Sequence, residues 1–324
     1  MEVVVLSHTE VRELLPVSDC IEVMERALVD LTKGDVWHPL RTVMRPPQEP
    51  SLMGLMAAHR SAPKPDYGIK VVCIFPGNRA RGLESHFGTV TLFDGDTGAP
   101  LAIVEAGAVT AIRTAAVSAV ATRALARTDS TRLAILGAGI QSRAHLEALA
   151  AVRQFNSARI WGRTEAHARS VAEDADVPFP VEVVSSAREA VADADVVATT
   201  TSSPEPIVDR EWFAPGAHIN AVGSSVATAR EIDAATVATA ALFADRRESF
   251  YAEAGDYLLA ADEIGPREVR AELGEVLTGA AEGRRDAEEL TLFKSLGLAV
   301  EDLAAVEHLY RRATETGSGQ RVEL

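Results

Sequence analysis

The sequence predicts an α/β protein in which a Rossmann-type doubly wound parallel sheet is joined to an α+β domain. From residue 131 onward, short apolar runs alternate with segments of helical period, as in parallel strands linked by crossover helices. The stretch "RLAILGAGIQSRAHLEAL", residues 132–149, passes from an apolar strand through Gly-x-Gly into a helix. These observations predict an α+β domain over residues 1–118 and a Rossmann domain over residues 119–302.

The N-terminal domain is expected to begin with two helices. "TEVRELLP" and "SDCIEVMERALVDLTKG" have helical period, with Ser7 and Ser18 as N-caps. "YGIKVVCIFPGN" and "HFGTVTLFDGDTGAPLAIVEA" are predicted strands joined by Asp/Gly turns. Helices followed by hairpins make an α+β module.

The Rossmann domain is predicted from strands and helices in alternation. The expected strands are "RLAIL", "SARIW", "VEVV", "DVVATTT", "AHINAVG" and "ALFAD". The segment from residue 296, "LGLAVEDLAAVEHLYRRATE", is helical, with acidic residues early and basic residues late, as the helix dipole favours. Its period does not say which domain it packs on.

Composition excludes several classes of protein. The 324 residues are 47% hydrophobic and 24% charged, which is ordinary for a globular chain of about two domains. A net charge of -15 disfavours nucleic acid. Two cysteines are too few for a disulfide framework, the start lacks signal-peptide features, and Arg113 and Arg123 interrupt the apolar stretches. We therefore expect a cytoplasmic protein without a membrane segment.

The Gly-x-Gly turn is the candidate cofactor site. Gly137 would make the turn and Gly139 would allow a pyrophosphate to approach the helix N-terminus, while Ser142 replaces the usual third glycine. The alternative is a tight turn without a ligand. The second strand ends in Gly162, Arg163 and Thr164 without an acidic residue, which favours NADP(H) over NAD(H).

NAD(H) remains possible, because Arg163 could instead be a solvated loop arginine. The candidate cofactor-binding residues are Gly137, Ala138, Gly139, Ile140, Gln141, Gly162, Arg163, Thr164, Thr200, Thr201, Val222 and Gly223.

Three cations are candidates for holding a substrate carboxylate: Arg41, Lys70 and Arg113. Lys70 shares a strand face with Val72 and Ile74, so it needs a partner. Each of the three could instead be a surface cation with a buried stem. His86 is a candidate for substrate binding or proton transfer, or a structural histidine. The sequence contains no metal-ligand spacing and no Gly-x-Ser-x-Gly elbow.

In order along nearly the whole chain, several stretches resemble the ornithine cyclodeaminase and mu-crystallin family. They are "GIKVVCIFPGN", "GTVTLFDGDTGAPLAIVEAGAVTAIRTAAVSAVATRALA", "LAILGAGIQSRAHLEAL", "IWGRT", "PGAHINAVGSS", "AELGEV" and "FKSLGLAVEDLAA". The resemblance implies a homodimer, an N-terminal substrate and dimerisation domain, and a C-terminal helix, residues 303–324, that returns to it. It places the carboxylate-binding arginines on Arg41 and Arg113 and the active-site lysine on Lys70.

Ser225 separates the branches of this family. It stands where the cyclodeaminases, which the chain resembles, carry a catalytic aspartate, and serine is no carboxylate base near neutral pH. The mu-crystallin branch also has serine there, so the resemblance implies an NAD(P)H-dependent oxidoreductase of a small imino or amino acid. The expected catalytic set is Lys70, Arg41, Arg113, His86 and Ser225.

Two other functions stay open. One is a cyclodeaminase-type lyase that recycles its NAD internally, and the other is an NADPH-dependent binding protein with little turnover. The fold is expected to survive replacement of Lys70 or Arg113, because both residues would line a cleft and not hold it together.

Overall fold

The computed structural model describes residues 2–324, and the chain divides into two compact units. Unit 1 comprises the chain up to Arg113 together with residues 298–324, and unit 2 comprises residues 114–297. The boundaries expected from the sequence, 118 and 302, each lie five residues beyond these divisions. The first division falls inside helix α3 (Ala106–Leu125), and the second immediately precedes α11 (Ala299–Thr316). Helical period does not reveal where along a helix the packing partner changes. The predicted fold class is confirmed, with one unit of each kind.

Unit 1 begins with β1 (Glu2–Leu6), α1 (His8–Leu14) and α2 (Val17–Lys33). A capping box starts α1, in which Ser7 and Glu10 satisfy each other's backbone amides. The N-cap of α2 is Pro16, so the expectation that Ser18 caps this helix is wrong by two residues. Gly34, with φ 82°, ends α2 in the left-handed conformation.

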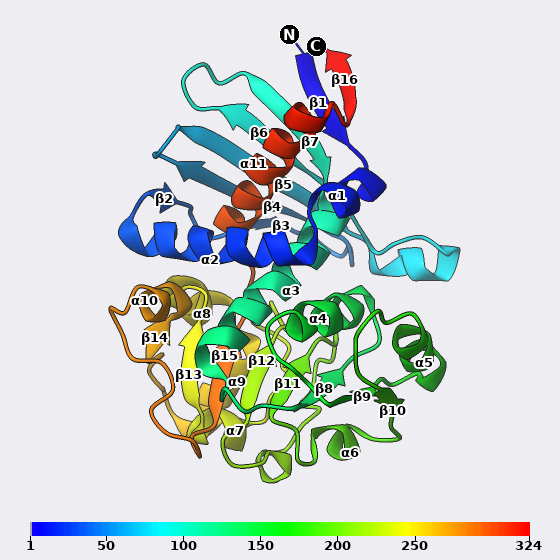
Figure 1. The fold of residues 1–324 in the computed structure, drawn as a ribbon, viewed down its shortest axis with the longest axis vertical. Coiled ribbons are helices and arrows are strands. Elements are labelled where there is room, and N and C mark those ends of the chain that lie inside the picture. The colour runs from blue at the N-terminus through cyan, green and yellow to red at the C-terminus, as the bar shows by residue number, and fades with distance from the viewer. Residues whose placement is uncertain (1) are drawn as a thin grey trace. The chain divides into compact units, whose positions relative to one another are not determined.

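The sheet of unit 1 has eight strands: β1, β2 (Val36–Trp37), β3 (Thr42–Met44), β4 (Leu52–Arg60), β5 (Asp66–Ile74), β6 (His86–Asp94), β7 (Pro100–Glu105) and β16 (Gln320–Glu323). Their order is β16-β1-β7-β6-β5-β4-β2, with β3 also paired to β4, and η1 (Pro76–Arg81) follows β5 along the chain. Helix α11 lies across one face of this sheet (Figure 1). A Cβ on Gly68 would approach a methyl group of Leu303 to 2.9 Å, so glycine lets α11 pack closely on β5.

The chain does not end in a helix. Gly317, with φ 70°, terminates α11, and β16 (Gln320–Glu323) then pairs antiparallel with β1. The helix expected over residues 303–324 therefore begins four residues earlier, at Ala299, and stops at Thr316. Strands β1 and β16 are thus neighbours at one edge of the sheet (Figure 1).

Unit 2 contains a second eight-stranded sheet, in the order β10-β9-β8-β11-β12-β15-β13-β14, in which every neighbouring pair is parallel. Its strands are β8 (Arg132–Leu136), β9 (Ser157–Trp161), β10 (Val181–Val183), β11 (Val196–Thr199), β12 (His218–Ala221), β13 (Ala241–Ala244), β14 (Ala271–Glu272) and β15 (Thr291–Lys294). The first strand of this unit, β8, has β9 and β10 on one side and β11 and the later strands on the other. The order of the strands therefore switches direction between β8 and β11. This switch point is where a Rossmann sheet binds its ligand.

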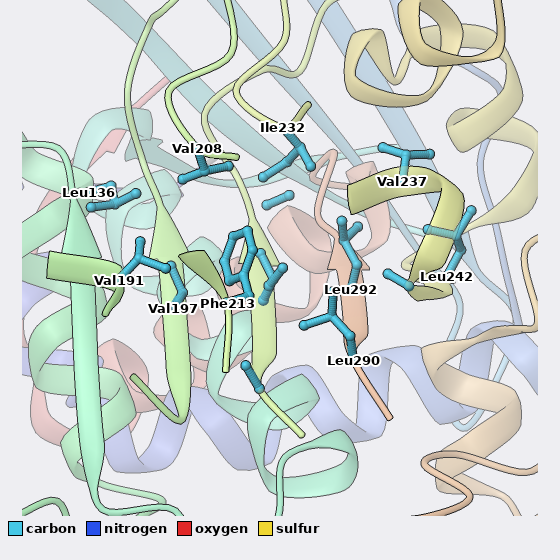
Figure 2. Packing of buried hydrophobic residues seen from close by; sticks show 14 of the residues in the cluster. Leu136, Val191, Val197, Val208, Phe213, Ile232, Val237, Leu242, Leu290 and Leu292 are labelled. Carbon is cyan, nitrogen blue, oxygen red and sulfur yellow. The ribbon is translucent and has the colours of Figure 1, made fainter. Parts of the chain in front are cut away.

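Helices pack against both faces of the unit 2 sheet (Figure 1). They are α4 (Ile140–Ala150), α5 (Glu165–Glu173), α6 (Ala187–Val191), α7 (Ala234–Thr239), α8 (Arg247–Glu253), α9 (Gly255–Ile264) and α10 (Leu273–Leu277), with η2 (Arg210–Trp212) between β11 and β12. Figure 2 shows one of the two cores they enclose, in which Phe213 lies among aliphatic side chains such as Val197 and Leu292. Helix α3 is long and apolar enough to cross a membrane by length and composition, but 78% of that stretch is buried, as in a core helix.

Candidate functional site

Lys70 and Arg113 form one buried cluster with two acidic residues at the start of α11. Lys70 Nζ lies 2.7 Å from Asp302 Oδ2. Arg113 donates from Nε to Asp302 Oδ1 at 3.0 Å and from Nη1 to Glu301 Oε2 at 2.9 Å. The side chains of the two cations are 4% exposed, and those of the carboxylates 1% or less. The structure thus brings together two of the three predicted substrate-binding cations.

The sheet sets the direction of the Lys70 side chain. Lys70 and Gly68 share a strand face because side chains alternate along β5, and Gly68 packs against α11. Asp302 lies in the first turn of α11, so it supplies the partner that a lysine on this apolar face requires. Arg113 reaches the same carboxylate from α3.

Arg41 and His86 occupy different places in unit 1. Arg41 is half-buried, and its charge is close enough to Lys70 to lower that residue's pKa. His86 is exposed and starts β6, four residues before Val90, which pairs with Lys70. It therefore lies about 13 Å along the strand from the lysine, with Ser85 Oγ 2.8 Å from its Nδ1. The charge of Arg41 thus reaches Lys70, and His86 lies apart from the lysine.

We define the cation cluster as Arg41, Lys70, Arg113, Glu301 and Asp302. Burial and neighbouring charges together shift the pKa values of Lys70 and Asp302. Burial lowers the pKa of Lys70 to about 8, and Arg113 and Arg41 act in the same direction while Asp302 opposes them. Burial opposes ionisation of Asp302, but Arg113 and Lys70 outweigh it and hold the pKa of that carboxyl below its usual range. The cluster therefore holds three cationic and two acidic side chains, and ion pairs join Lys70 and Arg113 to Asp302 and Glu301.

The charge of the cluster should depend on pH near the pKa of Lys70. Below about pH 8 the lysine is protonated, and above it the cluster loses this positive charge. We expect kcat/KM for an anionic substrate to fall about tenfold per pH unit above pH 8, because kcat/KM reports ionisation of the free enzyme. Lys70→Arg should move the fall to higher pH. An identical profile in this variant would assign the ionisation to another group.

Sequence reasoning did not identify Glu301 and Asp302 as members of the site. Their position early in α11 was explained by the helix dipole, whereas the structure pairs them with cations more than 180 residues away in the chain. The available signal was an acidic pair inside the apolar run "LGLAVEDLAAV". Two adjacent carboxylates in a buried helical turn require charged partners.

In unit 2, the turn between β8 and α4 has the shape of a dinucleotide cradle. Gly137 has φ 134°, and a Cβ there would lie 2.5 Å from Thr200 Oγ1. At Gly139, the N-cap of α4, a Cβ would meet nothing within 4 Å. Ala138, Ile140 and Gln141 complete the turn and begin the helix, whose first amides have no partner within the helix. The open space at Gly139 and these amides fit a pyrophosphate.

The residues that follow β9 pack closely against this turn. A Cβ on Gly162 would lie 2.6 Å from the Cβ of Ala138, so glycine is needed for the close packing. Arg163 is exposed, and Thr164 is the N-cap of α5 but makes no side-chain capping bond. These residues stand where a Rossmann domain contacts the adenosine ribose.

Two further loops follow β11 and β12 at the same edge of the sheet. Thr200 donates to Leu136 O and lies 2.9 Å, Oγ1 to Oγ, from Ser142 of α4, joining the first loop to the turn. Thr201 and Gly223 are also held by hydrogen bonds, and Val222 is buried beside them. The Ser224 hydroxyl is buried without a hydrogen-bond partner within the described residues. An unsatisfied buried hydroxyl at this edge fits a site that a polar ligand completes.

Ser225 lies on the loop after β12, in unit 2, whereas the cation cluster belongs to unit 1. Ser225 is half-buried and directly follows Ser224 in this loop. Within residues 2–324, no group of three or more His, Cys, Asp or Glu side chains could hold a metal ion.

Comparisons with known proteins identify the family of the chain. The model of the ornithine cyclodeaminase/mu-crystallin family matches residues 1–317. The chain is 41% identical over 309 residues to the ketimine reductase mu-crystallin of Mus musculus, covering 94% of this chain and 96% of that one.

Two solved structures are similar over their whole length. The Delta(1)-pyrroline-2-carboxylate reductase of Thermococcus litoralis, in complex with NADH and L-proline, has a TM-score of 0.95 and 36% identity, covering 98% of this chain and 100% of that one. An archaeal alanine dehydrogenase dimer with bound NAD has a TM-score of 0.94 and 29% identity, with both chains fully covered.

Proposed function

Because the chain belongs to the ornithine cyclodeaminase/mu-crystallin family and is an NAD(P)H-dependent oxidoreductase of the imine reductase type, we propose that it reduces a small cyclic imino acid with NADPH. The observation that carries this proposal is the buried pair of cations, Lys70 and Arg113, held side by side by Asp302 and Glu301. Two cations fixed in this way suit a single substrate carboxylate. The relative from Thermococcus litoralis, crystallised with L-proline, supports a substrate of this size.

The residues of unit 1 would bind and orient the substrate. The fork of Arg113 and the ammonium of Lys70 would hold the carboxylate, with Arg41 adding positive charge. Asp302 and Glu301 keep both cations in place before the substrate arrives. A fixed carboxylate fixes the adjacent C=N carbon, and such positioning supplies much of the rate.

The residues of unit 2 would hold the dinucleotide, with Gly137, Gly139 and the start of α4 at the pyrophosphate. The bound nicotinamide supplies a hydride to the C=N carbon. If the imine nitrogen is already protonated, reduction gives the amine without a further proton, so the chain needs no acid at the nitrogen. The distant position of His86 is compatible with that chemistry.

A reductase is favoured over a cyclodeaminase because Ser225 replaces the carboxylate that the lyase uses. The test is NADPH oxidation with a panel of cyclic imino acids, and with α-keto acids plus ammonia or methylamine. We expect cofactor and substrate to be consumed in equal amounts, and ornithine with NAD to yield neither proline nor ammonia. Proline and ammonia without net cofactor use would identify a lyase, and tight NADPH binding without turnover would identify a binding protein.

Arg163 is proposed to select NADP(H), since it is exposed at the end of β9 where no carboxylate competes. Arg163→Ala should weaken NADPH binding by about 1–3 kcal/mol through loss of a charge-assisted phosphate contact. NADH binding should change little. Fluorescence titration with both cofactors measures this difference, and an equal loss for NADPH and NADH would contradict the assignment.

We also propose a cytoplasmic homodimer. The sheet face of unit 1 opposite α11 presents half-buried and exposed apolar side chains, including Ile69, Phe87 and Ile103. The dimeric state of the archaeal alanine dehydrogenase supports a second copy of this chain as its cover. Sedimentation velocity would measure the mass. Free Cys20 and Cys73 suit a reducing compartment.

A further inference from the structure

Glu231 joins two loops at the carboxyl edge of the unit 2 sheet. Its Oε1 accepts from the amide of Thr201 at 2.6 Å and from the Thr201 hydroxyl at 2.7 Å. Its Oε2 accepts from the amide of Gly223 at 2.7 Å and from the Thr199 hydroxyl at 2.8 Å. One carboxylate, fully buried, thus accepts hydrogen bonds from the ends of both β11 and β12.

A second carboxylate, that of Asp256, holds the backbone of Glu231 in place. Asp256, at the start of α9, accepts from the backbone amides of Glu231 and Ile232 at 2.6 and 2.9 Å. Its other oxygen pairs with Lys294 Nζ, at the end of β15, at 2.8 Å. Asp256 and Lys294 are buried, so three neighbouring strand ends are connected through one chain of polar contacts.

The loops pack closely around Glu231. A Cβ on Gly223 would lie 2.0 Å from Thr201 O and 2.6 Å from Glu231 Oε2. A Cβ on Gly255 would lie 2.0 Å from Ala229 O, in the segment between Ser225 and Glu231. Glycine at both positions therefore allows the close approach in which Glu231 reaches the amides of both loops.

We propose that Glu231 is a positioning residue, which holds the loops after β11 and β12 in the conformation that binds the nicotinamide half of the cofactor. This inference rests on the proposed function, because it assigns these loops to the cofactor. The sequence marks Thr201 and Gly223 as candidate contacts but not Glu231. Glu231 acts through them and touches neither substrate nor cofactor.

The decisive variant is Glu231→Gln, tested in the full-length chain. A glutamine has one acceptor oxygen, so its NH2 group would face the donors of one of the two loops. Leaving those buried donors unsatisfied should weaken NADPH binding about tenfold to a hundredfold. The KM for NADPH should rise accordingly, while the KM for Delta(1)-pyrroline-2-carboxylate should stay within about twofold, because the carboxylate-binding cluster belongs to unit 1.

Asp195→Asn is the matched control. Asp195 is also a buried carboxylate of unit 2 and accepts from the backbone amides of Thr131 and Arg132, both at 2.9 Å. It precedes β11 and therefore lies at the amino edge of the sheet, opposite the loops. This variant should lose thermal stability but keep its affinity for NADPH. If Glu231→Gln does not fold, Thr199→Val removes a single hydroxyl donor and should still weaken NADPH binding several-fold.

Fluorescence titration with NADPH and steady-state kinetics distinguish the possible results. Loss of affinity in Glu231→Gln but not in Asp195→Asn supports the proposal. Equal affinity in wild type and Glu231→Gln, or an equal loss in Glu231→Gln and Asp195→Asn, overturns it and leaves the proposed function intact. A wild-type chain that binds neither NADPH nor NADH would overturn both.

Discussion

Lys70→Met is expected to lower kcat/KM about 10- to 150-fold, because it removes one charge-assisted hydrogen bond to the substrate carboxylate. It should also lower the free energy of unfolding by about 3 kcal/mol, since Asp302 would stay buried with one partner fewer. Steady-state kinetics and chemical denaturation on the same preparation measure the two effects. The sequence predicts that the fold survives this replacement, and the ion pair between Lys70 and Asp302 predicts in addition that it survives with reduced stability.

The double variant Lys70→Met/Asp302→Asn separates the two roles of Lys70. Neutralising Asp302 removes the unpaired charge, so much of the lost stability should return, while the amide oxygen of the introduced asparagine can still accept a hydrogen bond from Arg113. Turnover should remain low because the substrate carboxylate still lacks its lysine. Recovery of kcat/KM together with stability would show that Lys70 is only structural.

Arg113→Lys is expected to lower kcat/KM by roughly one to two powers of ten, about 1.4–2.8 kcal/mol. A lysine cannot reproduce the fork that reaches Asp302 from Nε and Glu301 from Nη1. The free energy of unfolding should therefore fall as well. The Kd for NADPH should not change, since the contacts of Arg113 that hold these carboxylates lie in unit 1 and the cofactor loops belong to unit 2.

Arg60→Lys provides the control for this substitution. Arg60 is another buried arginine of unit 1 that bridges two carboxylates, Asp30 and Glu307, at 2.7 and 2.9 Å. Its replacement should destabilise the fold without affecting kcat/KM. Equal losses of kcat/KM in Arg60→Lys and Arg113→Lys would mean that Arg113 acts through stability alone, and the carboxylate clamp would lie elsewhere.

Local patterns were sufficient to predict the turn between β8 and α4. The strand, the glycines and the helix of residues 132–149 are adjacent in sequence, and their backbone requirements are met within that stretch. In the structure, the two glycines of this pattern correspond to a positive φ at Gly137 and to open space at Gly139. The face of β5 that carries Lys70 likewise followed from alternation over a few residues.

Features that depend on distant parts of the chain could not be predicted in this way. The sequence identified the strand at Ala241–Ala244, but β15 lies between it and β12, and strand order depends on packing between remote segments. Similarly, the partners of Glu301 and Glu231 are separated from them in sequence, and a carboxylate on its own does not reveal which donors it will meet.

Unit 1 is built from two segments that are far apart in the sequence, and this affects how the protein folds during its synthesis. Unit 2 is continuous, so all its strands are available once residue 297 has emerged from the ribosome. Unit 1 must wait for the last segment, because α11 covers its sheet and β16 pairs with β1. Domains that lie early in a chain generally fold during synthesis, whereas contacts of long sequence separation form slowly. Until residues 298–324 have emerged, Lys70 and Arg113 therefore lack their counter-charges on α11, and the nascent first domain is the stage of this protein most exposed to aggregation.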